Sequence, residues 1–169
     1  ESAGRSGLDS DKLKLRADNK QDANIVINLR DDFERSINTT AVNLSVFGNI
    51  EGVQLKSEDG DWGTSALAET NEDGKALFKV RSLKAGNVKL NAIAEAIVFW
   101  DESITQTVTR ELELEFMPCI SAENSIINLE PTDGIVFIDD QSKAKVTVSL
   151  KGLDPSDPIP NRSIQILGL

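Results

Sequence analysis

The 169-residue sequence contains no histidine and no tyrosine, and its only cysteine is Cys119. Histidine is the side chain that enzymes most often use as a general base, and it is the most common ligand of transition metals. Without histidine a papain-like Cys–His pair is excluded, and one cysteine cannot form an internal disulfide. We therefore predict that the chain is not an enzyme, and we interpret Cys119 as a small buried side chain.

Positive charge and long apolar runs are also scarce. The sequence has 18 Lys and Arg residues against 28 Asp and Glu residues, which gives a net charge of −10. Because an acidic surface repels the phosphates of nucleic acids and of anionic membranes, we expect neither as a partner. The longest apolar run, residues 96–100, is far shorter than the roughly 20 residues that span a bilayer as a helix. We expect no direct membrane insertion.

The clearest pattern that is present lies in residues 71–94. Two runs, residues 75–81 and 87–94, alternate apolar and polar side chains. Side chains alternate across a strand, so this period of two predicts strands with one buried face and one solvated face. We predict that the two strands form a hairpin. The positions expected to point inward are Ala76, Phe78, Val80, Val88, Leu90, Ala92 and Ala94.

This stretch resembles a known kind of domain. The turn and strand at Asp73-Gly74-Lys75-Ala76, followed by Ala85-Gly86 and an alternating strand, are similar to the second half of a bacterial immunoglobulin-like domain of the invasin/intimin type. The resemblance implies an all-β fold, an immunoglobulin-like β-sandwich. Residues 23–29, 42–46 and 104–116 alternate in the same way and support it, whereas residues 51–69 have poor periodicity and are expected to form a loop.

We predict one complete sandwich followed by the first strands of a second. Pro118 and Cys119 interrupt the alternating pattern and mark the boundary. The predicted division is a linker at residues 1–7, an immunoglobulin-like sandwich at residues 8–117, a linker at residues 118–125, and a partial second immunoglobulin-like repeat at residues 126–169.

The second repeat is inferred from residues 146–150, which repeat the pattern of residues 25–29 at an offset of 121 (146 − 25). Half a sandwich buries too little apolar surface to be stable alone. We therefore expect that the protein continues beyond Leu169 or that another chain completes the sheet by adding strands.

Carboxylates gather in several turns, of which residues 57–63 are the most turn-prone. Calcium prefers oxygen ligands, but no stretch has the spacing of an EF-hand. We interpret these carboxylates as solvated turn residues and expect no cofactor. If a calcium ion binds, Asp59 and Asp61 are the candidate ligands.

Three aromatic residues are candidate contact residues: Trp62, Phe99 and Trp100. Trp62 is either an exposed contact residue or an anchor that folds its loop over the core. Phe99 and Trp100 end the apolar run; they contact a neighbouring domain or a receptor if they are exposed, and they cap the core if they are buried.

The resemblance to invasin and intimin implies a non-catalytic structural or adhesive module, a stalk or spacer of a bacterial surface or secreted protein. It implies an extracellular or cell-surface location, with neighbouring domains of the same longer chain, and a host or surface protein or glycan, as partners. The alternative is an accessory carbohydrate- or protein-binding module of a secreted enzyme, which a groove lined by Trp62 or Trp100 would favour. A third interpretation is a subunit completed by strand exchange.

Overall fold

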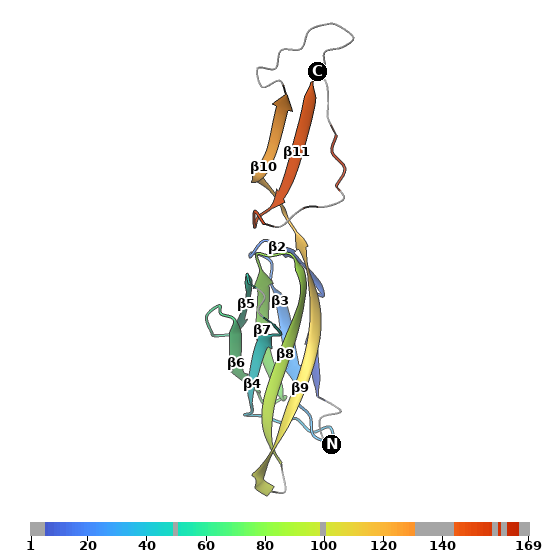
Figure 1. The fold of residues 1–169 in the computed structure, drawn as a ribbon. Helices are drawn as coiled ribbons and strands as arrows, with labels where there is room; N and C mark the ends of the chain where they lie inside the picture. The colour runs from blue at the N-terminus through green and yellow to red at the C-terminus, as the bar shows by residue number, and fades with distance from the viewer. Residues whose placement is uncertain are drawn as a thin grey trace. The chain divides into compact units, whose positions relative to one another are not determined.

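The computed structural model describes residues 6–48, 51–98, 101–130, 144–156, 159 and 162–165. Every regular element within these residues is a β-strand, which confirms the all-β prediction. The chain forms two compact units, Glu1–Met117 and Pro118–Leu169, called unit 1 and unit 2 below (Figure 1). In the described part of the chain, no helix is long and apolar enough to cross a membrane.

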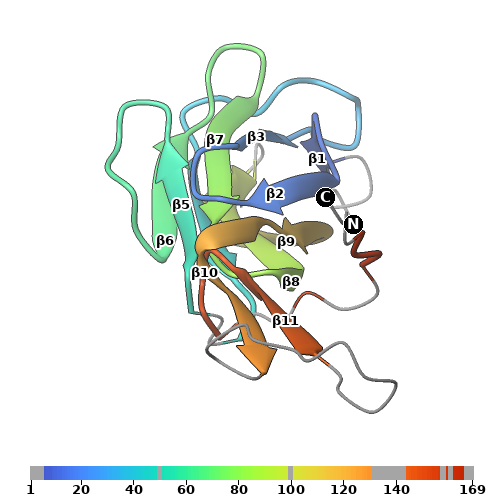
Figure 2. The same ribbon diagram turned by 90° about the horizontal axis from the view of Figure 1, so that it is seen from above.

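Unit 1 is a sandwich of a four-stranded and a five-stranded sheet, whose layers are seen from above in Figure 2. The four-stranded sheet has the order β1 (Gly7–Ser10), β3 (Ala23–Asn28), β7 (Lys75–Ser82) and β5 (Val53–Ser57). The five-stranded sheet has the order β2 (Lys14–Ala17), β9 (Asp101–Pro118), β8 (Gly86–Val98), β4 (Ala41–Val46) and β6 (Ser65–Glu69).

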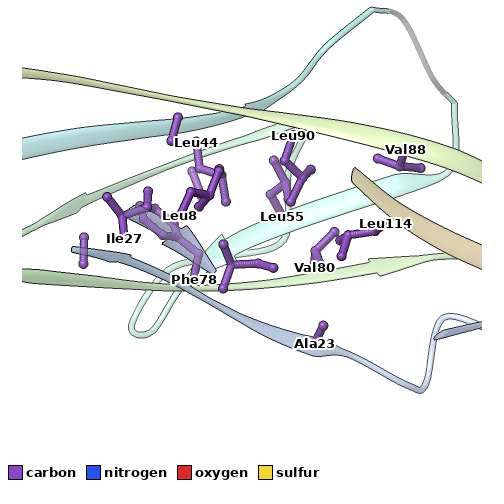
Figure 3. Close-up of a cluster of buried hydrophobic side chains, with 14 of the residues drawn as sticks. Leu8, Ala23, Ile27, Leu44, Leu55, Phe78, Val80, Val88, Leu90 and Leu114 are labelled. Atoms are coloured by element: carbon purple, nitrogen blue, oxygen red, sulfur yellow. The ribbon is translucent and has the colours of Figure 1, made fainter. Parts of the chain in front are cut away.

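The core lies between the facing sides of these two sheets (Figure 3). Phe78 on β7 is 2% exposed and Leu90 on β8 is fully buried. Burying one such side chain stabilises the fold by about 1.5–3 kcal/mol. All seven positions predicted to point inward from residues 75–81 and 87–94 are buried, so the predicted faces of these two strands are confirmed.

The hairpin predicted for the same stretch was wrong. β7 belongs to the four-stranded sheet and β8 to the five-stranded sheet. A corner at Ser82 carries the chain from one layer to the other: the Ser82 hydroxyl donates to the carbonyl oxygen of Lys84 (2.7 Å) and accepts from its N–H (3.0 Å). Alternation along a strand shows which face is buried, but it carries no information about the neighbouring strand.

Two further expectations for unit 1 differ from the structure. Residues 51–69 contain β5 and β6, where a loop was expected. Ser6 and Gly7, expected in a linker, belong to the sandwich: Gly7 begins β1, and buried Ser6 accepts a hydrogen bond through its carbonyl oxygen from Nε of Arg110 (2.7 Å). These strands are short, so each offers only two or three alternating positions to a sequence pattern.

Unit 2 contains an antiparallel pair of strands, β10 (Ile120–Glu130) and β11 (Lys145–Gly152). Most of the linker expected at residues 118–125 is therefore strand. Cys119 is half-buried and not fully buried as interpreted, and its carbonyl oxygen accepts a hydrogen bond from the N–H of Leu153 (3.1 Å). Several apolar side chains of this pair are exposed, Ile127 to 74%.

Candidate functional site

Trp62 lies against the outer face of β5 and β7. The centre of its ring is 3.9 Å from the guanidinium carbon of Arg81 and 5.3 Å from Nζ of Lys56. Arg81 follows buried Val80 on β7, and Lys56 follows buried Leu55 on β5. Because side chains alternate across a strand, both cations lie on the face of the sheet that points away from the core.

The loop that carries Trp62 is tied to the edge of β5. The N–H of Gly63 donates to the carbonyl oxygen of Leu55 (2.8 Å), and the N–H of Leu55 donates back to the carbonyl oxygen of Gly63 (2.7 Å). Trp62 is half-buried and is not part of the core cluster. It therefore anchors its loop, but on the outer face of the sheet and not over the core.

Arg81 is held in place over the ring by a second contact, because its Nε donates a hydrogen bond to Oε1 of Gln54 (2.9 Å) on β5. A cation stacked on an exposed aromatic ring contributes about 0.5–1 kcal/mol. The guanidinium of Arg81 occupies one face of the Trp62 ring, so a sugar cannot stack on that face. The geometry suits a structural contact better than a sugar-binding platform.

The carboxylates of the same loop do not gather into a metal site. Asp59 and Asp61 are exposed, and among the described residues no group of three or more His, Cys, Asp or Glu side chains lies close enough together to hold a metal ion. Two carboxylates alone supply too few of the six to eight oxygens that calcium takes.

Phe99 and Trp100 lie outside the described residues. The strands on either side of them are described: β8 and β9 pair in antiparallel fashion as far as Val98 and Asp101. The role of Phe99 and Trp100 as contact residues stays a prediction.

Sequence reasoning missed Phe33, which is 74% exposed in the loop between β3 and β4. Its loop is ordered around Asp31, whose carboxylate accepts hydrogen bonds from the N–H groups of Phe33 and Arg35 (both 2.9 Å) and from Nε of Arg35 (2.7 Å). The sequence pattern that could have identified Phe33 is a single aromatic residue among four charged residues at positions 31–35.

Comparisons with known proteins support the fold. No protein-family model matches the sequence, and no curated protein matches it. The structure is similar to that of invasin, described as a bacterial integrin-binding protein, with a TM-score of 0.50 and 14% identity over 87% of this chain and 26% of that chain.

Two other solved structures match with lower scores. The D00-D0 domain of intimin gives a TM-score of 0.47 and 17% identity over 66% of this chain and 46% of that chain. A glycosyl hydrolase family 2 member from Bacteroides cellulosilyticus gives a TM-score of 0.43 and 18% identity over 66% of this chain and 14% of that chain. The predicted resemblance to the invasin/intimin type of immunoglobulin-like sandwich is confirmed as a likeness of fold. This chain spans about a quarter of the invasin chain.

Proposed function

We propose that this chain is a non-catalytic spacer module of a bacterial surface or secreted protein, which holds a binding domain away from the cell. One observation carries the proposal: the path of the chain through unit 1. The carbonyl oxygen of Ser6 contacts Arg110 of β9, and the chain leaves unit 1 at Met117, seven residues (117 − 110) farther along the same strand. At about 3.3 Å per residue, Arg110 and Met117 are roughly 23 Å apart along the strand. A spacer needs such a separation.

The strand pairing of unit 2 supports a second copy of the same module. β11 contains residues 146–150, which repeat the pattern of residues 25–29, and all of these but Leu29 lie in β3. β3 pairs in antiparallel fashion with the earlier strand β1, and β11 pairs likewise with the earlier strand β10. Tandem repeats suit a stalk, and neighbouring domains of a longer chain are then its proposed partners. Phe99 and Trp100 are proposed to lie at such a contact.

The spacer can be tested by placing this chain between an anchor and a reporter epitope on a bacterial surface, with the epitope's distance from the membrane as the readout. A folded spacer is expected to give a narrower distribution of distances than a Gly/Ser linker of equal length, whose ends fluctuate widely. Equal widths for the two would contradict the proposal.

The alternative is an accessory binding module of a secreted enzyme, for which the Trp62 surface is the candidate. It predicts that the chain is retarded in gels containing a polysaccharide and that Trp62→Ala removes the retardation. The stacking of Arg81 over Trp62 favours the spacer. We therefore expect no retardation of either form, and retardation that depends on Trp62 would establish the alternative.

A further inference from the structure

Unit 1 has four edge strands, and three of them are short or capped. β1 has only four residues. The edge of β5 is capped by the two hydrogen bonds between Leu55 and Gly63. On β2 the N–H of Arg16 donates to Oε1 of Gln21 (2.7 Å), so a side chain covers that edge. Such devices prevent a sheet from pairing with another chain.

The fourth edge, β6, has its free backbone groups pointing outward. The N–H of Thr70, just after β6, donates to the carbonyl oxygen of Thr40, just before β4 (3.0 Å). Backbone groups of successive residues point to opposite sides of a strand. Ala66 and Ala68 therefore point their N–H and C=O groups toward β4, as Thr70 does. The residues whose groups point away from the sheet are Ser65, Leu67 and Glu69.

A hydrogen bond on the other side of β4 gives the same result independently. The N–H of Phe47 donates to the carbonyl oxygen of Lys89 (2.7 Å), so the odd-numbered residues of β4 face β8. The even-numbered residues then face β6. These are Val42 and Leu44, which lie opposite Ala68 and Ala66 in the register.

The side chains of β6 offer little of the usual protection of an edge, because the only charged one is Glu69 at its end. Its sequence, Ser-Ala-Leu-Ala-Glu, has no proline and no basic residue, in contrast to Lys14 and Arg16 on β2. Leu67, at its centre, is 65% exposed. The side chains of Ala66 and Ala68, on the face of β6 that points to the core, are small, so they do not obstruct the approach of another backbone. Such an edge is suited to receive one more strand.

We propose that β6 pairs in antiparallel fashion with β6 of a second copy of this chain, with Leu67 opposite Leu67. The strand is complementary to itself in this register, because each Ser65 hydroxyl then lies opposite a Glu69 carboxylate. The two leucine side chains meet on the outer face and cover each other. The contact is a closed two-fold one, so it stops at a dimer. This inference does not depend on the proposed spacer function.

The dimer is expected to be weak and to depend on salt. One short strand per copy buries less surface than a permanent interface does. Each copy carries a net charge of −10, and salt screens the repulsion between the copies. Sedimentation equilibrium from about 10 µM to about 1 mM, at low and at high salt, covers the range in which such contacts dissociate. We expect a monomer–dimer equilibrium that shifts toward the dimer at high salt.

The first variant is Leu67→Lys, which places two like charges directly opposite each other. We expect the dissociation constant to rise about tenfold or more. The matched control is Leu13→Lys, a similar change at a leucine that is 57% exposed and lies outside β6. Equal sensitivity of the two variants, or a dimer that Leu67→Lys leaves unchanged, would overturn the proposal.

The second variant tests the register. Leu67→Cys in a Cys119→Ser background is expected to form a disulfide-linked dimer on mild oxidation, because hydrogen-bonded antiparallel pairs have Cα atoms about 5.5 Å apart, within disulfide range. Leu13→Cys in the same background is the control and is expected to stay monomeric. A chain that is monomeric at the highest concentration refutes the second copy as the occupant and leaves the edge for a strand of another protein.

Discussion

Gly74 closes the turn before β7 with a φ of +73°, a value that side chains other than glycine rarely adopt. A Cβ atom at this position would lie 2.6 Å from the carbonyl oxygen of Leu29. The turn cannot move away easily, because the N–H of Leu29 donates to the carbonyl oxygen of Gly74 (2.8 Å). The residue therefore connects the start of β7 to the end of β3.

We expect Gly74→Ala to lower the free energy of unfolding by about 1–3 kcal/mol, measured by urea denaturation. Gly7→Ala is the control, since the nearest atom to its added Cβ would lie at 3.6 Å. That variant should change the free energy of unfolding by no more than about 0.5 kcal/mol. Similar losses in both variants would show that the close approach to Leu29 is not the cause.

The carboxyl of Asp31 makes the stability of the fold depend on pH. Desolvation raises the pKa of its carboxyl, but the hydrogen bonds from Arg35 and from the N–H of Phe33 leave the pKa below its ordinary value of 3.8. A folded-state pKa below the unfolded one stabilises the fold above about pH 3.8, and this contribution is lost as the pH falls through the folded value.

We therefore expect the melting temperature of the unmodified chain to fall more steeply with acidification below pH 3.8 than that of Asp31→Asn, which has no carboxyl to titrate at this position. The measurement is a series of thermal melts between neutral and strongly acidic pH. Parallel curves for the two proteins would exclude a role for Asp31 in the acid response.

At the scale of the element, β7 separates a core face from a solvent face at adjacent residues. Phe78 is 2% exposed and Leu77 is 38% exposed. Phe78→Ala leaves a cavity between the sheets and should cost about 3–5 kcal/mol of unfolding free energy. Leu77→Ala leaves none and should cost no more than about 1 kcal/mol. A comparable loss in both, measured by chemical denaturation, would mean that the faces of β7 are assigned wrongly.

The loop between β5 and β6 gives a prediction about calcium. Because Asp59 and Asp61 belong to no cluster of metal-ligating side chains in the described residues, we expect the melting temperature to be the same with millimolar calcium as with a chelator. A rise that calcium causes and that Asp59→Asn abolishes would instead place an ion at this loop.

The strands that the sequence predicts are those with several large apolar residues in alternation. β3, β4, β7, β8 and β9 all have this pattern. β6 was missed because its inward positions are Ala66 and Ala68, whose small side chains contrast little with serine. The position of Trp62 could not be predicted either, because Arg81 reaches it from a different strand, 19 residues (81 − 62) later in the chain.

At the scale of the whole molecule, the core cluster found among the described residues belongs to unit 1. Every residue of the core cluster lies between Leu8 and Phe116. We expect a chain that ends at Met117 to fold alone and to melt within about 4 °C of the full chain, the shift that roughly 1 kcal/mol produces in a domain of this size. A much lower melting temperature in differential scanning calorimetry would show that unit 2 supports the sandwich.

The path of the chain from Ser6 to Met117 also determines how unit 1 responds to tension. A pull between these two points acts along the strands, whereas the backbone hydrogen bonds between β1 and β3 lie across them. The four residue pairs of that ladder are then loaded in shear and must rupture together, not one after another. The hydrogen bond from Arg110 to Ser6 adds a tie between the pulled end and β9. The architecture thus favours resistance to stretching.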